Sequence, residues 1–89
     1  MRQPRSLERI VKGFASYRRL QILELLQVNP ELSLSEISER LKMQFRNTSQ
    51  HISKMASAGL VMKRHDGTEV RHKLTERGEK ALEFARKLE

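Results

Sequence analysis

Polar side chains gather on one short stretch of the chain, residues 44–61, which reads QFRNTSQHISKMASAGLV. Apolar residues such as Ile52 and Met55 recur in it at helical spacing, which predicts an amphipathic helix with a polar outer face. Such a face suits a polar and acidic partner. Its members can donate or accept hydrogen bonds or carry positive charge: Arg46, Asn47, Ser49, Gln50, Ser53 and Lys54.

These residue types are those that read double-stranded DNA. Arginine bonds guanine in a bidentate manner, asparagine and glutamine bond adenine, and serine bonds several partners. The alternative interpretation is an ordinary solvated helix face. On the DNA interpretation, base contacts come from Arg46, Asn47, Ser49, Gln50 and Ser53. Contacts to the phosphate backbone come from Lys42, Lys54, Lys63, Arg64, His65 and Arg71.

The charge of the chain supports an anionic partner. The 89 residues carry a net charge of +7, and five of those seven charges lie between Leu41 and Thr75. Only 37% of the residues are hydrophobic and 4% aromatic, so the core must be aliphatic. We expect one domain over residues 1–89, small enough for a dimer interface to add to its core.

Several other classes of function find no support in the sequence. Cysteine is absent, and three scattered histidines without carboxylate partners do not predict a metal site. We expect His51 at the edge between helix and core, and His72 to be partly buried. No catalytic constellation is present, so we expect neither an enzyme nor a cofactor. The sequence has no membrane-spanning run and no secretory signal, which indicates the cytoplasm.

The first half of the chain predicts three helices. Residues 1–5 are expected to be a flexible lead-in, followed by a helix that Ser6 caps and that ends near Ala15. Ser16 is expected to cap a second helix, which Asn29-Pro30 ends. Residues 33–36 read SLSE, a capping box that starts the third helix.

The polar stretch follows this third helix after a short break, so residues 33–58 form a helix-turn-helix. Its second helix runs from about Phe45 to Ala58, and Gly59 is expected to cap it. Four residues are expected to dock this helix on the core: Phe45, Thr48, Ile52 and Met55.

Residues 60–74 predict a two-stranded hairpin with Asp66-Gly67 as its turn and with Val70, His72 and Leu74 facing inward. Thr75 is expected to cap a last helix over residues 76–89. The order is therefore α-α-α-α-β-β-α, a mainly α fold with a small antiparallel β-hairpin. A helix-turn-helix followed by a basic hairpin is a winged helix-turn-helix.

The segments FASYRRLQILELL, ELSLSEISERLKM, NTSQHISKMASAGLV and HDGTEVRHKLTERG resemble the arsenical-repressor-like (ArsR-like) winged-helix regulators. The segment KLTERGEKAL also resembles the multiple-antibiotic-resistance (MarR-like) regulators. The resemblance covers nearly the whole chain. It implies a homodimeric transcriptional regulator, usually a repressor, that binds a pseudo-palindromic operator. It places dimer contacts on the first and last helices, at Leu7, Ile10, Val11, Phe14, Leu82, Ala85 and Leu88.

Among the departures of the sequence from that family, two concern metal sensing and the start of the second helix of the helix-turn-helix. Metal-sensing members carry cysteines in the stretch that matches residues 31–36, where this chain has serines, so metal sensing is not implied. Gln44 stands where the family usually has a serine-type cap. Two alternative functions stay open: an architectural protein that coats DNA without sequence preference, and a winged helix that contacts protein or RNA.

Overall fold

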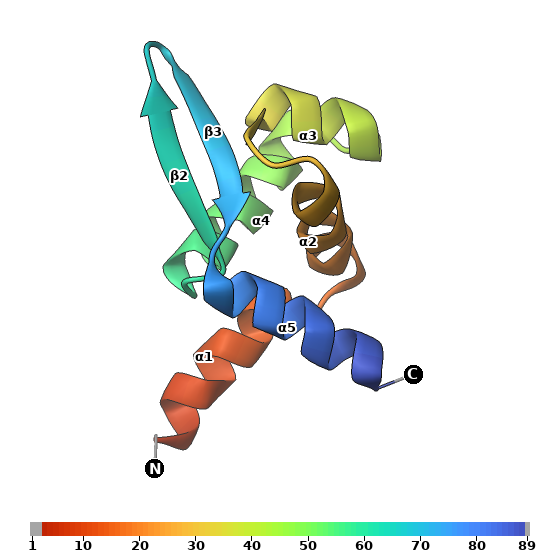
Figure 1. Ribbon diagram of the computed structural model, residues 1–89, viewed down its shortest axis with the longest axis vertical. Coiled ribbons are helices and arrows are strands. Elements are labelled where there is room, and N and C mark those ends of the chain that lie inside the picture. Colours follow the sequence, from red (N-terminus) through yellow and green to blue (C-terminus); the bar gives the residue numbers. More distant parts are fainter. Residues whose placement is uncertain (1–2, 89) are drawn as a thin grey trace.

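The computed structural model describes residues 3–88 and is a winged helix-turn-helix, as the sequence predicts (Figure 1). The two long strands form a hairpin that projects from the helical body, and α5 crosses the body near the end of α1. The elements are α1 (Pro4–Phe14), α2 (Tyr17–Val28), β1 (Leu32–Ser33), α3 (Leu34–Leu41), α4 (Phe45–Ser57), β2 (Val61–Asp66), β3 (Glu69–Leu74) and α5 (Glu76–Lys87).

The predicted helix starts are confirmed at three places. The Ser16 hydroxyl accepts a hydrogen bond from the Arg19 backbone N–H, and the Thr75 hydroxyl accepts one from the Gly78 N–H. At α3 the capping box is complete, because Ser33 also donates its backbone N–H to the Glu36 carboxylate at 2.9 Å. Each cap satisfies a backbone donor that the first turn of a helix leaves free.

The predicted start of the first helix is wrong. The helix begins at Pro4, within the segment expected to be a flexible lead-in, and Gln3 precedes it without a side-chain cap. Proline is favoured at the first helical position, because its φ is preset and its missing N–H has no intrahelical partner there. Of the expected lead-in, residues 1 and 2 lie outside the described part of the chain.

The sheet has three strands in the order β1-β3-β2, all antiparallel, where the sequence predicts only a hairpin. The third strand is the two-residue β1, whose Leu32 and Ser33 pair with His72 and Arg71.

The predicted hairpin turn is displaced by one residue. Asp66 pairs with Glu69, so the loop is Gly67-Thr68 rather than Asp66-Gly67. Gly67 has a φ of +64°, a conformation that glycine adopts without strain at the first position of a two-residue loop.

The core is aliphatic and lies between α2, α4, α5 and the base of the sheet. α2 contributes Ile22, Leu23 and Leu26, which are at most 1% exposed. The other fully buried large side chains are Ile37, Thr48, Ile52, Met55, Leu60 and Leu82. Thr48, Ile52 and Met55 therefore dock α4 on the core as predicted.

The prediction that Phe45 also docks α4 is wrong, because its side chain is 55% exposed. Phe45 is the first residue of α4 and extends past the edge of the core. Instead it borders a groove of about 630 Å³ between the start of α4 and the hairpin, which Lys63 and His65 also line.

Candidate nucleic-acid interface

The outer face of α4 is a continuous polar stripe. Because the helix buries Thr48, Ile52 and Met55, residues on its opposite side at i, i+4 and i+7 point to solvent, and these include Arg46, Gln50 and Ser53. Within residues 3–88, none of the five predicted base-contacting side chains makes a hydrogen bond or an ion pair. Four of them are exposed, namely Arg46, Asn47, Gln50 and Ser53, and Ser49 is half-buried.

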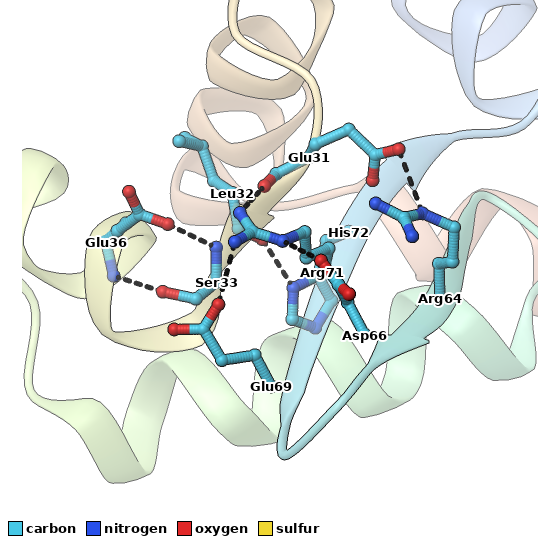
Figure 2. A network of polar contacts seen from close by, with 9 residues as sticks. All are labelled: Glu31, Leu32, Ser33, Glu36, Arg64, Asp66, Glu69, Arg71 and His72. Carbon is cyan, nitrogen blue, oxygen red and sulfur yellow. Dashed lines mark hydrogen bonds and ion pairs between the residues drawn. The ribbon is translucent and has the colours of Figure 1, made fainter.

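The predicted phosphate-contacting residues fall into two groups. Lys42, Lys54, Lys63 and His65 are exposed, and their side chains have no partner among the residues that the structure describes. The other two, Arg64 and Arg71, are engaged with carboxylates and belong to the network that Figure 2 shows.

In that network Arg71 is the central donor. Its Nε lies 3.2 Å from Asp66 Oδ2, and its Nη2 lies 2.8 Å from Glu69 Oε2. Its Nη1 donates to the backbone carbonyl of Glu31 at 3.1 Å. Arg64 Nε lies 3.1 Å from the Glu31 carboxylate. Both guanidinium groups are therefore partly neutralised within the protein.

The register of the hairpin explains this division. Lys63 lies opposite His72 and His65 opposite Val70, whereas Arg64 lies opposite Arg71. Residues directly opposite share one face of a sheet, and neighbours along a strand point to opposite faces. Lys63 and His65 thus share the face that borders the groove beside Phe45, and the two arginines share the face that carries the acidic residues.

Glu31 is a structural residue of this network that the sequence does not reveal. Its backbone has a φ of +70°, unusual for a residue with a side chain, and its N–H donates to the His72 carbonyl at 2.8 Å. One carboxylate oxygen binds Arg64, and the other is buried without a partner in the described part of the chain. Glu31 therefore joins the loop before β1 to both strands of the hairpin.

Two histidines have structural surroundings. His72 is 2% exposed, and its Nδ1 lies 2.9 Å from the Leu32 carbonyl; because a carbonyl only accepts, this nitrogen carries the hydrogen. Burial lowers the pKa of His72, against the opposing effect of that hydrogen bond. His51 is half-buried, and its Nδ1 accepts from Arg19 Nε at 3.1 Å. Within residues 3–88, no group of three or more His, Asp or Glu side chains could hold a metal ion.

The predicted dimer-forming residues separate into surface and core. Leu7, Val11 and Leu88 are 46%, 49% and 70% exposed, whereas Ile10 and Ala85 are half-buried. Phe14 and Leu82, at 8% and 2% exposed, belong to the core of the protomer, so the prediction of a surface role for these two is wrong. The apolar stripe of each helix is wide enough to contact the core on one side and remain exposed on the other. Sequence spacing alone does not show which residues of the stripe lie on which side.

An exposed aromatic residue, Phe84, adds to the apolar surface of α5 at 53% exposure. It falls outside the set predicted from the sequence. No helix within residues 3–88 is long and apolar enough to cross a membrane.

Comparison with known proteins identifies the family. Residues 16–62, from the cap of α2 to the second residue of β2, match the winged helix-turn-helix DNA-binding family. The chain belongs to this family. It is a DNA-binding fold of transcription regulators and not an enzyme family. The match spans the polar stripe of α4 and the helix that precedes it.

The winged helix-turn-helix is also found in the relatives of the chain. The chain is 38% identical over 73 residues to the transcriptional activator HlyU of Vibrio cholerae serotype O1. The aligned residues cover 82% of this chain and 67% of the relative. The solved structure of HlyU from Vibrio cholerae N16961 superposes with a TM-score of 0.79 at 33% identity, covering 94% of this chain and 91% of that one.

A second solved structure is the homodimeric winged helix-turn-helix DNA-binding domain of a possible ArsR-family regulator from Mycobacterium bovis. It superposes with a TM-score of 0.84 at 27% identity, covering 94% of this chain and 78% of that one. These similarities confirm the predicted ArsR-like resemblance.

Proposed function

We propose that the chain binds double-stranded DNA sequence-specifically, as a homodimer that regulates transcription from a pseudo-palindromic operator. The observation that carries the proposal is the outer stripe of α4, whose polar side chains have no partner within the described residues. In a helix-turn-helix the second helix enters the major groove and its N-terminal residues reach the base edges. Arg46, Asn47, Gln50 and Ser53 are then the base-reading residues, with Ser49 at the edge of the stripe.

Phe45 extends this base-reading set. An exposed aromatic ring at the start of α4 suits contact with the methyl group of a thymine. Replacing that thymine by deoxyuridine removes only the methyl group. We expect this change to weaken wild-type binding and to leave the binding of a Phe45→Ala variant unchanged.

Phosphate contacts come from the basic residues that have no partner among the described residues, Lys42, Lys54, Lys63 and His65. Lys63 and His65 face the groove beside Phe45, so they reach the backbone next to the bases that α4 reads. Arg71 uses all three of its side-chain nitrogens within the protein, so it contacts a phosphate only by exchanging its partners. Arg64 is bonded to Glu31 through Nε. We assign both mainly to positioning the hairpin.

Dimer contacts come from the exposed apolar residues of α1 and α5. An exposed apolar surface on a small protein indicates an interaction site, and the homodimeric relative supports a second copy as the partner. Two-fold symmetry then sets half-sites about one helical turn apart, about 10 base pairs between centres. The residues are Leu7, Val11, Phe84 and Leu88, with Ile10 and Ala85 at the border.

We propose repression as the mode of regulation where the operator overlaps a promoter, because a bound dimer and RNA polymerase then compete for the same DNA. The sign follows from operator position, so a reporter assay with the selected operator placed over or upstream of a promoter measures it.

Selection from a random duplex pool at near-physiological salt tests the proposal. A two-fold symmetric enriched motif is expected. Arg46→Ala and Gln50→Ala should relax the preference at single positions, whereas Lys63→Ala should weaken binding to all sequences alike. Tight binding of every duplex without enrichment would instead indicate an architectural protein. No duplex binding at all would assign the stripe to RNA or protein.

A further inference from the structure

A second positively charged surface lies where α1 crosses the C-terminal end of α4. Here a groove of about 670 Å³, called the basic groove below, brings together side chains from α1, α2 and α4. Its charged lining comprises five cations and one carboxylate: Arg5, Arg9, Lys12, Arg19 and Lys54, with Glu8.

The α1 residues of this groove are fixed by helix periodicity. Arg5, Arg9 and Lys12 follow i, i+4 and i+7 spacing, so they share one face of α1. That face lies opposite the apolar one, which carries Leu7 and Val11 and is assigned above to the dimer. If α1 joins the two protomers, the basic groove therefore stays open to solvent.

Three contacts show that the groove keeps most of its positive charge. The one acidic lining residue, Glu8, lies 3.7 Å from Lys12, but both side chains are largely exposed, so water screens the pair. Arg19 is held in place by its bond to His51 and by a second bond from Nη1 to the Lys12 carbonyl. Neither of these acceptors is a carboxylate, so the charge of Arg19 is not neutralised.

The pKa of His51 is sensitive to the positive charge of the groove. After burial, the charges of Arg19 and Lys54 are the next causes that lower the pKa of His51. A neutral imidazole can accept the bond from Arg19, whereas a protonated one cannot. An anion bound between these two cations would raise the pKa of His51, which gives the site a spectroscopic signal of its own.

The basic groove continues the stripe of α4. Gln50, Lys54 and Ser57 follow i, i+4 and i+7 spacing, and the last two line the groove. A duplex that lies along α4 therefore passes over it. No aromatic or large apolar residue is among its lining, so the groove offers a nucleoside or an aromatic ligand no ring and no apolar wall to bind. Its cations suit phosphate groups.

We infer that the basic groove binds the phosphodiester backbone of the same duplex whose bases α4 reads. Lys63 and His65 contact the backbone near the N-terminal end of α4, and the basic groove contacts it near the C-terminal end. Both ends of the helix are then held on the DNA. This inference rests on the proposed function.

The test compares the salt dependence of DNA binding by two double variants of equal charge. Arg9→Gln with Lys12→Gln removes two cations of the groove. Lys80→Gln with Lys87→Gln removes two from α5, where Lys80 pairs with Glu76 at i, i+4 as Lys12 does with Glu8. Each neutralised phosphate contributes about −0.9 to the slope of log K against log salt.

Because a dimer loses the cations twice, we expect the groove variant to flatten that slope by about 2 or more on the selected operator and on unrelated duplexes alike. The α5 variant should keep the wild-type slope to within about 0.5. DNA should also raise the pKa of His51 in the wild type, measured by NMR of the imidazole, and raise it less in the groove variant.

Coinciding slopes for the two variants, with a selected operator in hand, would overturn the groove assignment and leave the proposed function intact. A wild-type protein that binds no duplex would overturn both. Saturable binding of inorganic tripolyphosphate that shifts His51, is lost in the groove variant and leaves the DNA slope unchanged would assign the groove to a free anion and overturn the duplex as its ligand.

Discussion

Gly13 allows α1 to lie directly on the end of α4, and replacing it should displace α1. A Cβ atom at position 13 would lie 2.5 Å from the Ala58 Cβ and 3.0 Å from Leu60 Cδ1. Carbon atoms in ordinary contact are about 3.5–4.0 Å apart, so the Cβ atoms of residues 13 and 58 would have to move apart by at least about 1 Å. Leu60 can rotate away, but the Cβ of Ala58 is fixed to the backbone.

The expected cost of Gly13→Ala follows from two opposing effects. Overpacking of this kind costs about 1–3 kcal/mol, whereas alanine gains about 0.8–1.0 kcal/mol over glycine inside a helix. Gly13 is the penultimate residue of α1, where the gain is smaller, so we expect a net loss of about 1 kcal/mol in the free energy of unfolding.

The sharper test is the double variant, Gly13→Ala with Ala58→Gly, which removes the atom that clashes. If the contact is the cause, the double variant should be more stable than the two single changes predict by about 1–3 kcal/mol. Urea unfolding measures this coupling. All four proteins should be compared at two fixed concentrations, because dimerisation adds to apparent stability.

Additivity of the two changes to within about 0.5 kcal/mol would refute the reasoning, since residues without a shared contact behave in that way. A Gly13→Ala protein more stable than the wild type would refute it as well, because helix propensity would then outweigh the contact.

Three further predictions concern the polar network. The fold lowers the pKa of His72, so the unfolded chain binds this proton at a higher pH than the folded protein does. The free energy of unfolding should therefore fall as the pH drops below 6.5, the ordinary pKa of histidine, and level off below the lowered pKa. His72→Gln should flatten the pH dependence of unfolding across that window, and His65→Gln on the exposed hairpin serves as the control. Ser33→Ala removes the cap of α3 and should cost about 1 kcal/mol in urea unfolding. The same change should raise the pKa of Glu36, which the Ser33 backbone and hydroxyl hold below its ordinary value of 4.5. The loss of stability as Glu36 is protonated should still begin near that ordinary value, but it should be smaller and end at a higher pH than in the wild type. Arg71→Lys keeps the charge but not the planar fork, so it should reduce hydrogen-exchange protection in the hairpin; unchanged protection would show that charge alone matters.

Local signals made most of the fold predictable. Ser16, the Ser33 capping box and Thr75 start helices because each cap acts within three residues, and Asn29-Pro30 ends α2 for an equally local reason. The buried side of α4 follows from its periodicity. The choice of base-reading residues was predictable in the same way, although the DNA contacts themselves stay a prediction.

Features that depend on distant residues were not predictable. β1 is only two residues long and exists because β3, about forty residues later, offers free backbone groups beside it. The pairing of Arg64 with Glu31 arises from that same approach. The basic groove was not predictable either, because residues 1–40 carry seven basic and five acidic side chains, a near balance along the chain that the fold separates in space.

The two-residue strand β1 determines which part of the hairpin can move independently of the helix-turn-helix. Leu32 and Ser33 belong to the sheet, and Ser33 also caps α3, so the lower part of the hairpin cannot swing without pulling on the helix-turn-helix. The pair formed by Ser33 and Arg71 is the point nearest the hairpin tip at which β1 holds β3. Beyond that pair, residues 65–70 form a short tip that can bend on its own. The protein would therefore follow variation in groove width with the tip of its wing, while the base of the wing and the reading helix move as one rigid piece.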